Sequence, residues 1–369
     1  MEHPTGITMT KPKANQQPIV VESAELRPGY SISRIIRGGW QLAGGHGSVD
    51  RQRAVDDFEK FLFAGINTYD CADIYTGVEE MIGRFISAVR SKYGHNDASK
   101  IKVHTKIVPD LDRLSTYTPR HIEKVIDRSL QRLGVERLDL VQFFWWDLNV
   151  GSPIDTLYSL SHLQEKGKIH LLGVTNWDVQ QIEPFFDSGL DIVSAQVQYS
   201  MLDQRPANQL VSWCAVNNVK LLCYGVLAGG FLTESWFGKT DPGYEFENRS
   251  LIKYRLIIDE FGGWDLFQVL MGELKSVADR HSVSISAVAT RYVLDQSQVG
   301  AVIIGARYAH NLSSTLAVFN LTLGSDDKAS IDSILSQRAG PSGPVYGLEG
   351  NRTGIHGSIM KYNLSGSLE

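Results

Sequence analysis

Short apolar segments alternate with longer segments of mixed polarity along most of this chain. In the longer segments apolar residues recur every three to four positions, which predicts amphipathic helices, whereas the short apolar runs predict buried strands. The predicted strands are 33–39, 66–70, 101–107, 138–144, 169–176, 192–200, 220–227 and 300–307. The predicted helices are 51–65, 78–94, 118–135, 153–168, 178–189, 207–218, two segments within 264–296 and one near 309–319, and the stretch 228–263 is predicted to be irregular.

This alternation predicts the fold class. Strands that alternate with helices indicate an α/β protein with a parallel sheet covered by helices. Eight such units fit a closed (β/α)8 TIM barrel better than an open doubly wound sheet, because "RGGWQLAGGHG" after the first strand lacks the G-x-G-x-x-G pattern. We expect one barrel domain at 29–337, a flexible N-terminal arm at 1–28, and a C-terminal tail or loop over the barrel at 338–369.

The ends of the predicted strands carry the candidate chemistry, because active sites of such barrels lie at the C-terminal ends of the strands. Asp70 and Tyr75 follow the second strand, and Lys106 lies near the end of the third. Buried charges are costly unless they are paired, so we expect Asp70 to neutralise Lys106. The cation of Lys106 is expected to lower the pKa of the Tyr75 phenol, which would make Tyr75 a general acid.

Composition and charge limit the partners and the compartment. Hydrophobic residues make up 43% of the 369 residues and charged residues 21%, which is typical of a globular protein. The net charge of −5 argues against nucleic acid, and no apolar run is long enough to span a membrane. Three cysteines and no recognisable signal segment indicate reduced thiols, and hence a cytoplasmic protein. No metal is expected.

Six segments, in order, resemble the aldo-keto reductase superfamily over roughly residues 30–335. "GINTYDCADIYTGVEEMIGRFI" is similar to the signature around the family's catalytic Asp and Tyr, and "VHTKI" to the segment with its Lys. "LLGVTNW", "SAQVQYS", "CYGVLAGGFL" and "VIIGAR" with "AHNLSSTL" are similar to its cofactor-binding segments.

The resemblance implies a (β/α)8 barrel that binds NADP(H) and transfers hydride to the carbonyl of a small-molecule substrate, an apolar or aromatic aldehyde or ketone. It implies Asp70, Tyr75 and Lys106 as the catalytic residues, and Arg307 as the partner of the 2′-phosphate. The residues that it implies for cofactor binding are Gly39, Trp40, Asp70, Thr175, Asn176, Gln196, Tyr224, Gly225, Leu227, Gly305, Arg307, Asn311 and Thr315.

The fourth strand departs from the family pattern. It usually ends D-L-x-x-x-H-W-P-D, and its His helps to polarise the substrate carbonyl. In "DLVQFFWWD" Phe144 takes the place of that His, and Trp146 takes the place of the Pro. Phe144 cannot donate a hydrogen bond to a developing oxyanion. With Trp145 and Trp146 it predicts an apolar substrate pocket.

Alternative interpretations stay open at this point. The chain could reduce a conjugated double bond, or be a nicotinamide-binding regulatory or scaffold protein with little turnover. His46 could replace the missing donor, whereas His104 is more typical of a core histidine, and Cys71 of a small buried hydrophobic residue. Asp70 and Lys106 could also be a purely structural ion pair.

Overall fold

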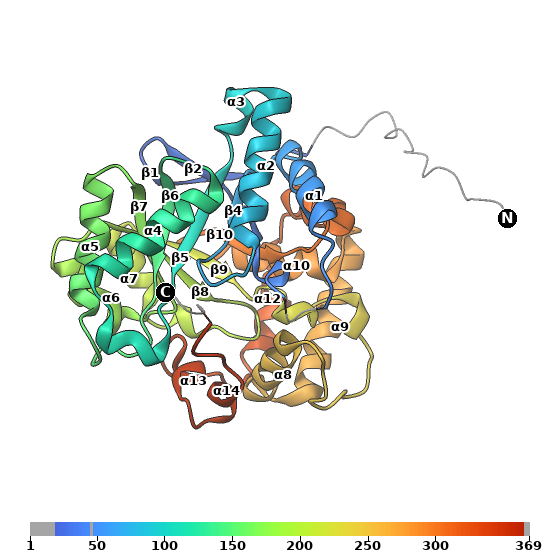
Figure 1. Cartoon of the computed structure of the whole chain (residues 1–369). Coiled ribbons are helices and arrows are strands. Elements are labelled where there is room, and N and C mark those ends of the chain that lie inside the picture. Colours follow the sequence, from blue (N-terminus) through green and yellow to red (C-terminus); the bar gives the residue numbers. More distant parts are fainter. Residues whose placement is uncertain (1–18, 45–46, 365–369) are drawn as a thin grey trace.

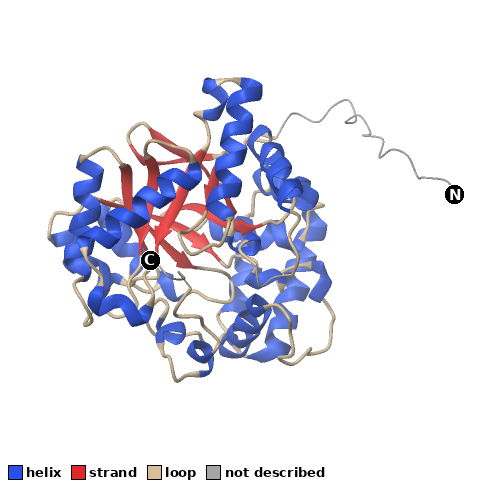
Figure 2. Cartoon of the chain, in the orientation of Figure 1, coloured by secondary structure: helices blue, strands red, loops and turns tan. Residues whose placement is uncertain are grey.

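The computed structural model of the chain describes residues 19–44 and 47–364, and it contains a closed parallel barrel surrounded by helices (Figures 1 and 2). Around the barrel the strands follow the order β10-β3-β4-β5-β6-β7-β8-β9. The eight are β3 (Ile35–Gly38), β4 (Thr68–Asp70), β5 (Lys102–Ile107), β6 (Leu138–Phe143), β7 (Ile169–Thr175), β8 (Ile192–Gln198), β9 (Lys220–Tyr224) and β10 (Val299–Gly305). Each lies within one residue of a predicted segment or inside it, so the predicted (β/α)8 TIM barrel is confirmed.

Helices of different lengths follow the strands, and most of them cover the outside of the barrel. They are α1 (Arg51–Phe63), α2 (Val78–Tyr93), α3 (His95–Ala98), α4 (Pro119–Leu133), α5 (Pro153–Glu165), α6 (Val179–Asp187), α7 (Leu210–Asn217), α8 (Arg249–Phe261), α9 (Gly263–His281), α10 (Ile285–Leu294), α11 (Leu312–Leu316), α12 (Ser325–Leu335), α13 (Gly347–Gly350) and α14 (Ile355–Ser358). None of the helices in the described part of the chain combines the length and the apolar character needed to cross a membrane.

A hairpin closes the end of the barrel away from Asp70 and Lys106. Strand β1 (Ser23–Arg27) pairs antiparallel with β2 (Tyr30–Ser33), and Leu26, Tyr30 and Ile32 are buried with residues of the barrel interior. The expected flexible arm at 1–28 is therefore wrong for residues 23–27. Their apolar side chains alternate with polar ones and cover the barrel interior, so the segment forms a strand.

The stretch 228–263 is not irregular throughout, because it contains the thirteen-residue helix α8. Asn248 caps the helix by accepting a hydrogen bond from the backbone N–H of Ser250, and Tyr254, Ile257, Ile258 and Phe261 are buried at helical spacing. The prediction was wrong here although both signals are present in the sequence.

The C-terminal segment 339–364 lies against the loops that follow the barrel strands. The backbone N–H of Ala339 donates to Phe261 O at the end of α8, and that of Val345 donates to Asp178 after β7. Leu111, after β5, donates its N–H to Tyr362 O at 3.0 Å. The segment, called the tail below, thus spans the end of the barrel at which β5 and β7 finish, and Figure 1 shows its helices α13 and α14 in red beside α8.

Candidate active site

An ion pair between Asp70 and Lys106 occupies the barrel mouth. Asp70 ends β4 and Lys106 lies on the adjacent strand β5, so closure of the sheet brings the two side chains together. Lys106 Nζ lies 2.7 and 2.6 Å from the two carboxylate oxygens of Asp70, and both side chains are 5% exposed. Both groups make further hydrogen bonds. Lys106 Nζ donates to Cys71 O at 2.8 Å, and the Asp70 carboxylate accepts from Gln196 Nε2 at 2.8 Å. A pair with this many hydrogen bonds tolerates burial.

Tyr75 lies beside this pair, on the turn between β4 and α2. Its ring centroid is 5.1 Å from Lys106 Nζ and 5.0 Å from the ring centroid of Trp40. Burial, followed by the negative charge of Asp70, raises the pKa of the Tyr75 phenol well above its usual value. The expectation that Lys106 lowers this pKa is therefore wrong, because Asp70 already neutralises the ammonium group. The phenol remains protonated at neutral pH, as a proton donor must be.

Three adjacent strands end in side chains that suit a carboxamide. Thr175 ends β7 and Asn176 follows it, Gln196 lies on β8 and Tyr224 ends β9. The backbone N–H of Asn176 donates to Gln196 O at 2.8 Å, and the Tyr224 hydroxyl donates to Asn176 Oδ1 at 2.7 Å. In the described part of the chain Asn176 Nδ2 and Gln196 Oε1 make no hydrogen bond, so one amide donor and one acceptor stay available. This set fits the carboxamide of a nicotinamide.

Glycines allow close approach at two of the predicted cofactor positions. Gly225 has φ +73°, and a Cβ there would lie 2.3 Å from the hydroxyl of Tyr254. Gly39 donates its N–H to Asp70 O at 2.8 Å, and a Cβ there would lie 2.7 Å from that oxygen. Leu227, two residues after Gly225, is half-buried.

The segment after β10 contains the residues predicted for the adenosine phosphate. Gly305 ends the strand, and Arg307 follows it with a half-buried side chain. The backbone carbonyl of Arg307 accepts a hydrogen bond from Arg37 at 2.9 Å, so β3 holds this loop. Asn311 precedes α11, and Thr315 lies within that helix. These residues lie on the β10 side of the mouth, next to β3 and away from Phe144, which follows β6.

The three aromatic residues after β6 do not share one environment. The ring of Phe144 contacts that of Trp146, with centroids 4.7 Å apart and planes at 82°. The Trp145 side chain is instead 1% exposed, packs against Tyr117 and Phe143, and donates its indole N–H to Val150 O at 2.9 Å. The structure therefore keeps Phe144 and Trp146 together and separates them from Trp145, although Phe144, at 4% exposed, is buried as well.

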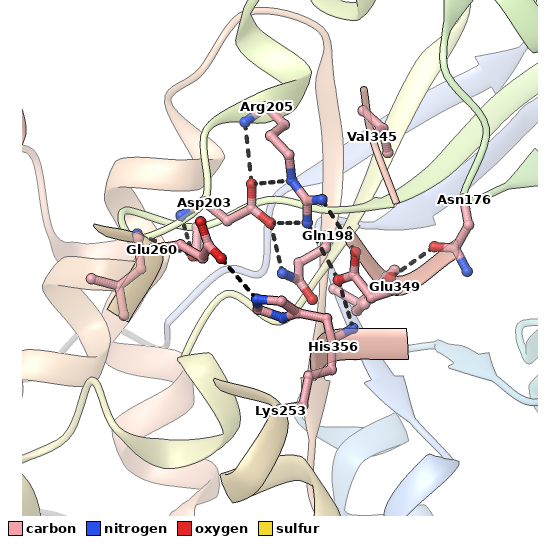
Figure 3. A network of polar contacts seen from close by, with 12 residues as sticks. Asn176, Gln198, Asp203, Arg205, Lys253, Glu260, Val345, Glu349 and His356 are labelled. Carbon is pink, nitrogen blue, oxygen red and sulfur yellow. Dashed lines mark hydrogen bonds and ion pairs between the residues drawn. The ribbon is translucent and has the colours of Figure 1, made fainter. Parts of the chain in front are cut away.

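Sequence reasoning missed the residues that the tail brings to this mouth. Tyr346 contacts Phe144, with ring centroids 5.8 Å apart, and Tyr362 contacts Trp146 at 4.8 Å. Glu349 of the tail is buried between Arg205, at 3.1 Å, and Lys253, at 3.3 Å (Figure 3). No local pattern marks these residues, because each depends on a partner far away in the sequence.

Asp203 completes the network that holds Glu349. Its carboxylate accepts from Arg205 Nε at 2.9 Å and Nη2 at 2.6 Å, and from Gln198 Nε2 at 2.6 Å (Figure 3). Arg205 thus forms ion pairs both with Asp203, which is close in the sequence, and with Glu349 of the tail. This sharing ties the tail to the loop after β8.

The remaining sequence candidates are placed as follows. His104 is fully buried, its Nε2 lies 3.3 Å from the Tyr30 hydroxyl, and burial lowers its pKa to about 3, so it is a neutral core histidine. Cys71 is buried, and burial raises the pKa of its thiol well above the usual value. Cys71, Cys214 and Cys223 are all free. His46 lies outside the described residues.

Comparisons with known proteins agree with this fold. Residues 34–336 match the model of the Aldo/keto reductase family. The chain is 27% identical to the NADH-specific methylglyoxal reductase of Escherichia coli (strain K12), over 80% of this chain and 93% of that protein. It is 26% identical to the chloroplastic pyridoxal reductase of Arabidopsis thaliana, over 82% of this chain and 83% of the relative.

Among solved structures, a glycerol dehydrogenase from Gluconobacter oxydans superposes with a TM-score of 0.72 and 26% sequence identity, over 87% of this chain and 98% of that one. The family consists of oxidoreductases that use a nicotinamide cofactor. Since the family model covers most of the chain, and the closed barrel agrees with it, this chain belongs to the aldo/keto reductase family.

Proposed function

We propose that the protein is an NADPH-dependent oxidoreductase that reduces the carbonyl group of an apolar or aromatic aldehyde or ketone. The observation that carries this proposal is the Asp70–Lys106 pair beside the protonated Tyr75 at the barrel mouth. The carboxamide-binding set of Asn176, Gln196 and Tyr224 lies on neighbouring strands of the same mouth, and Gln196 links the two groups through its hydrogen bond to Asp70.

In this proposal each side chain has a separate task. A reduced nicotinamide supplies the hydride when it is bound. Tyr75 gives its proton to the carbonyl oxygen, so that the alcohol forms as the carbonyl carbon gains the hydride. Asp70 and Lys106 hold each other in place through two short hydrogen bonds, beside the ring of Tyr75. Asn176 and Gln196 orient the nicotinamide through its amide, which fixes the distance to the reacting carbon.

The substrate class follows from the side chains around Tyr75. Trp40 contacts Tyr75 and is 40% exposed, and the half-buried Trp146 lies against the buried ring of Phe144 after β6. Aromatic walls with few polar groups favour apolar ligands. The relatives named for methylglyoxal and pyridoxal also act on carbonyl compounds, which supports the reaction type in this chain.

The preference for NADPH over NADH rests on Arg307. A guanidinium after β10 can form two parallel hydrogen bonds with a 2′-phosphate. The relative from Escherichia coli is named as NADH-specific, so the preference belongs to this chain's own residues rather than to the family. A cytoplasmic location is part of the same proposal, and the three free, buried thiols support it.

The test is steady-state oxidation of NADPH with a panel of aromatic and aliphatic aldehydes. We expect turnover that requires the carbonyl compound, and we expect Tyr75→Phe to abolish it while NADPH affinity, followed by protein fluorescence, stays unchanged. Tyr93→Phe is the matched control, because this exposed tyrosine lies at the end of α2 and its hydroxyl bonds to Glu59. Tight NADPH binding without turnover of any carbonyl compound would favour a regulatory protein and refute the enzyme.

A further inference from the structure

Phe144 leaves the mouth without the hydrogen-bond donor that its position provides elsewhere in the family, and a tail residue lies directly against it. The ring of Tyr346 meets the Phe144 ring edge to face, with centroids 5.8 Å apart and planes at 80°. On its other side, the Tyr346 ring centroid is 5.7 Å from Lys253 Nζ, which in turn lies 5.3 Å from the ring centroid of Tyr224. Tyr346 thus lies between the end of β6 and the end of β9.

The tail holds Tyr346 in an unusual backbone conformation. Its φ of +63° and ψ of +10° are left-handed, a region that bulky L-residues rarely adopt. Contacts on both sides enforce it, since Val345 N–H donates to Asp178 at 2.9 Å and Gly350 N–H donates to Tyr346 O at 2.9 Å. Three residues later Glu349 is buried against Arg205 and Lys253 (Figure 3). A rare conformation with this many constraints indicates a functional position.

The hydroxyl of Tyr346 is free to bind a ligand. The side chain is half-buried, and within the described residues its hydroxyl makes no hydrogen bond. By contrast, the hydroxyl of Tyr362, also in the tail, donates to Gly357 O at 2.8 Å. Burial, followed by the charge of Glu349, raises the pKa of the Tyr346 phenol well above its usual value, so the group is a hydrogen-bond donor at neutral pH.

We propose that Tyr346 donates a hydrogen bond to the carbonyl oxygen of the substrate and so takes over the task that Phe144 cannot perform. This inference rests on the proposed function. In the reaction the carbonyl carbon gains the hydride, the π electron pair moves onto oxygen, and Tyr75 supplies the proton. Tyr346 keeps its own proton and stabilises the charge that develops on the oxygen. The tail is then a part of the catalytic site as well as its cover.

The first test removes only the hydroxyl. We expect Tyr346→Phe to lower kcat/KM for 4-nitrobenzaldehyde with NADPH roughly a hundredfold, the effect of losing one oxyanion donor. NADPH affinity and the thermal midpoint should stay as in the wild type, because the ring still packs on Phe144. Tyr292→Phe is the control, since it removes a phenol hydroxyl bound to Asp332 on α12. Equal kcat/KM of wild type and Tyr346→Phe would overturn the inference and leave the proposed function standing.

The second test restores a donor at the neighbouring position. In the Tyr346→Phe background, Phe144→His should recover most of the lost kcat/KM, because the imidazole can donate to the same oxygen. A double variant that folds and binds NADPH but stays as slow as Tyr346→Phe would contradict the shared role of the two positions. If the wild type binds NADPH and reduces no carbonyl compound, the proposed function fails, and this inference fails with it.

Discussion

The ion pairs that hold the tail allow a quantitative prediction, which concerns the buried carboxylate of Glu349. Glu349 is fully buried and accepts hydrogen bonds from Arg205 at 3.1 and 3.3 Å, and Lys253 Nζ lies 3.3 Å from its carboxylate. Burial acts to raise the pKa of Glu349, but Lys253 and Arg205 together hold it at about 2, below its ordinary value of 4.5. Within the described residues Lys253 forms no other ion pair.

The lowered pKa sets the size of the effect. One pKa unit corresponds to about 1.36 kcal/mol, so the charged Glu349 stabilises the folded state by ~3 kcal/mol. Removal of one partner from a buried pair costs a similar ~3–5 kcal/mol. We expect Glu349→Gln to release the tail before the barrel unfolds, because Arg205 keeps its partner Asp203. At about 1.4 kcal/mol for each factor of ten, amide exchange in 339–364 should become roughly a hundredfold faster.

Hydrogen–deuterium exchange with mass spectrometry measures this directly, with protection factors normalised to the intrinsic rates at each pH. Glu123→Gln is the matched control, because it breaks an exposed pair with Lys168 and should leave protection of the tail unchanged. The folded-state pKa of Glu349 is depressed, so its contribution is complete above pH 4.5 and is lost as the pH falls toward 2. Equal protection of the tail in both proteins at pH 7, or a difference as large at pH 3 as at pH 7, would refute the reasoning.

Two substitutions at the barrel mouth test the remaining roles. Arg307→Ala should weaken NADPH binding and leave NADH binding nearly unchanged, and a wild type with equal affinity for the two cofactors, by fluorescence titration, would remove the basis for this expectation. Phe144→His in the otherwise unchanged protein should raise kcat/KM on small aldehydes by at most roughly tenfold, because Tyr346 already donates one hydrogen bond. On the natural, apolar substrate the same change should lower activity because apolar contact area is lost, and no change on either class would show that this position does not govern the chemistry.

The sequence was sufficient for the barrel and for the residues at the ends of its strands. Strands of a parallel barrel are buried on both faces, so each appears as a short apolar run, and a polar residue at the end of such a run is conspicuous. Asp70, Lys106 and Gln196 were identified in this way. A closed barrel brings the ends of all its strands to one rim, so the meeting of these three side chains followed from the topology alone. The helix α8 was also encoded locally, by Asn248 and the spacing of its apolar residues, although the prediction missed it.

Only the tertiary structure decided which segment covers the C-terminal rim of the barrel and in which direction the pKa of Tyr75 is shifted. Glu349 and Arg205 are 144 residues apart in the sequence, and neither lies in a pattern that points to the other. Local periodicity reports which face of an element is buried, but it carries no information about the partner that buries it. The pKa of Tyr75 is decided in the same way, because desolvation and the distance to Asp70 depend on the folded mouth. The strand ends are therefore determined by short-range pattern, whereas the tail, its ion pairs and the placement of Tyr346 against Phe144 are determined by long-range packing, whose energy exists only once the barrel has formed.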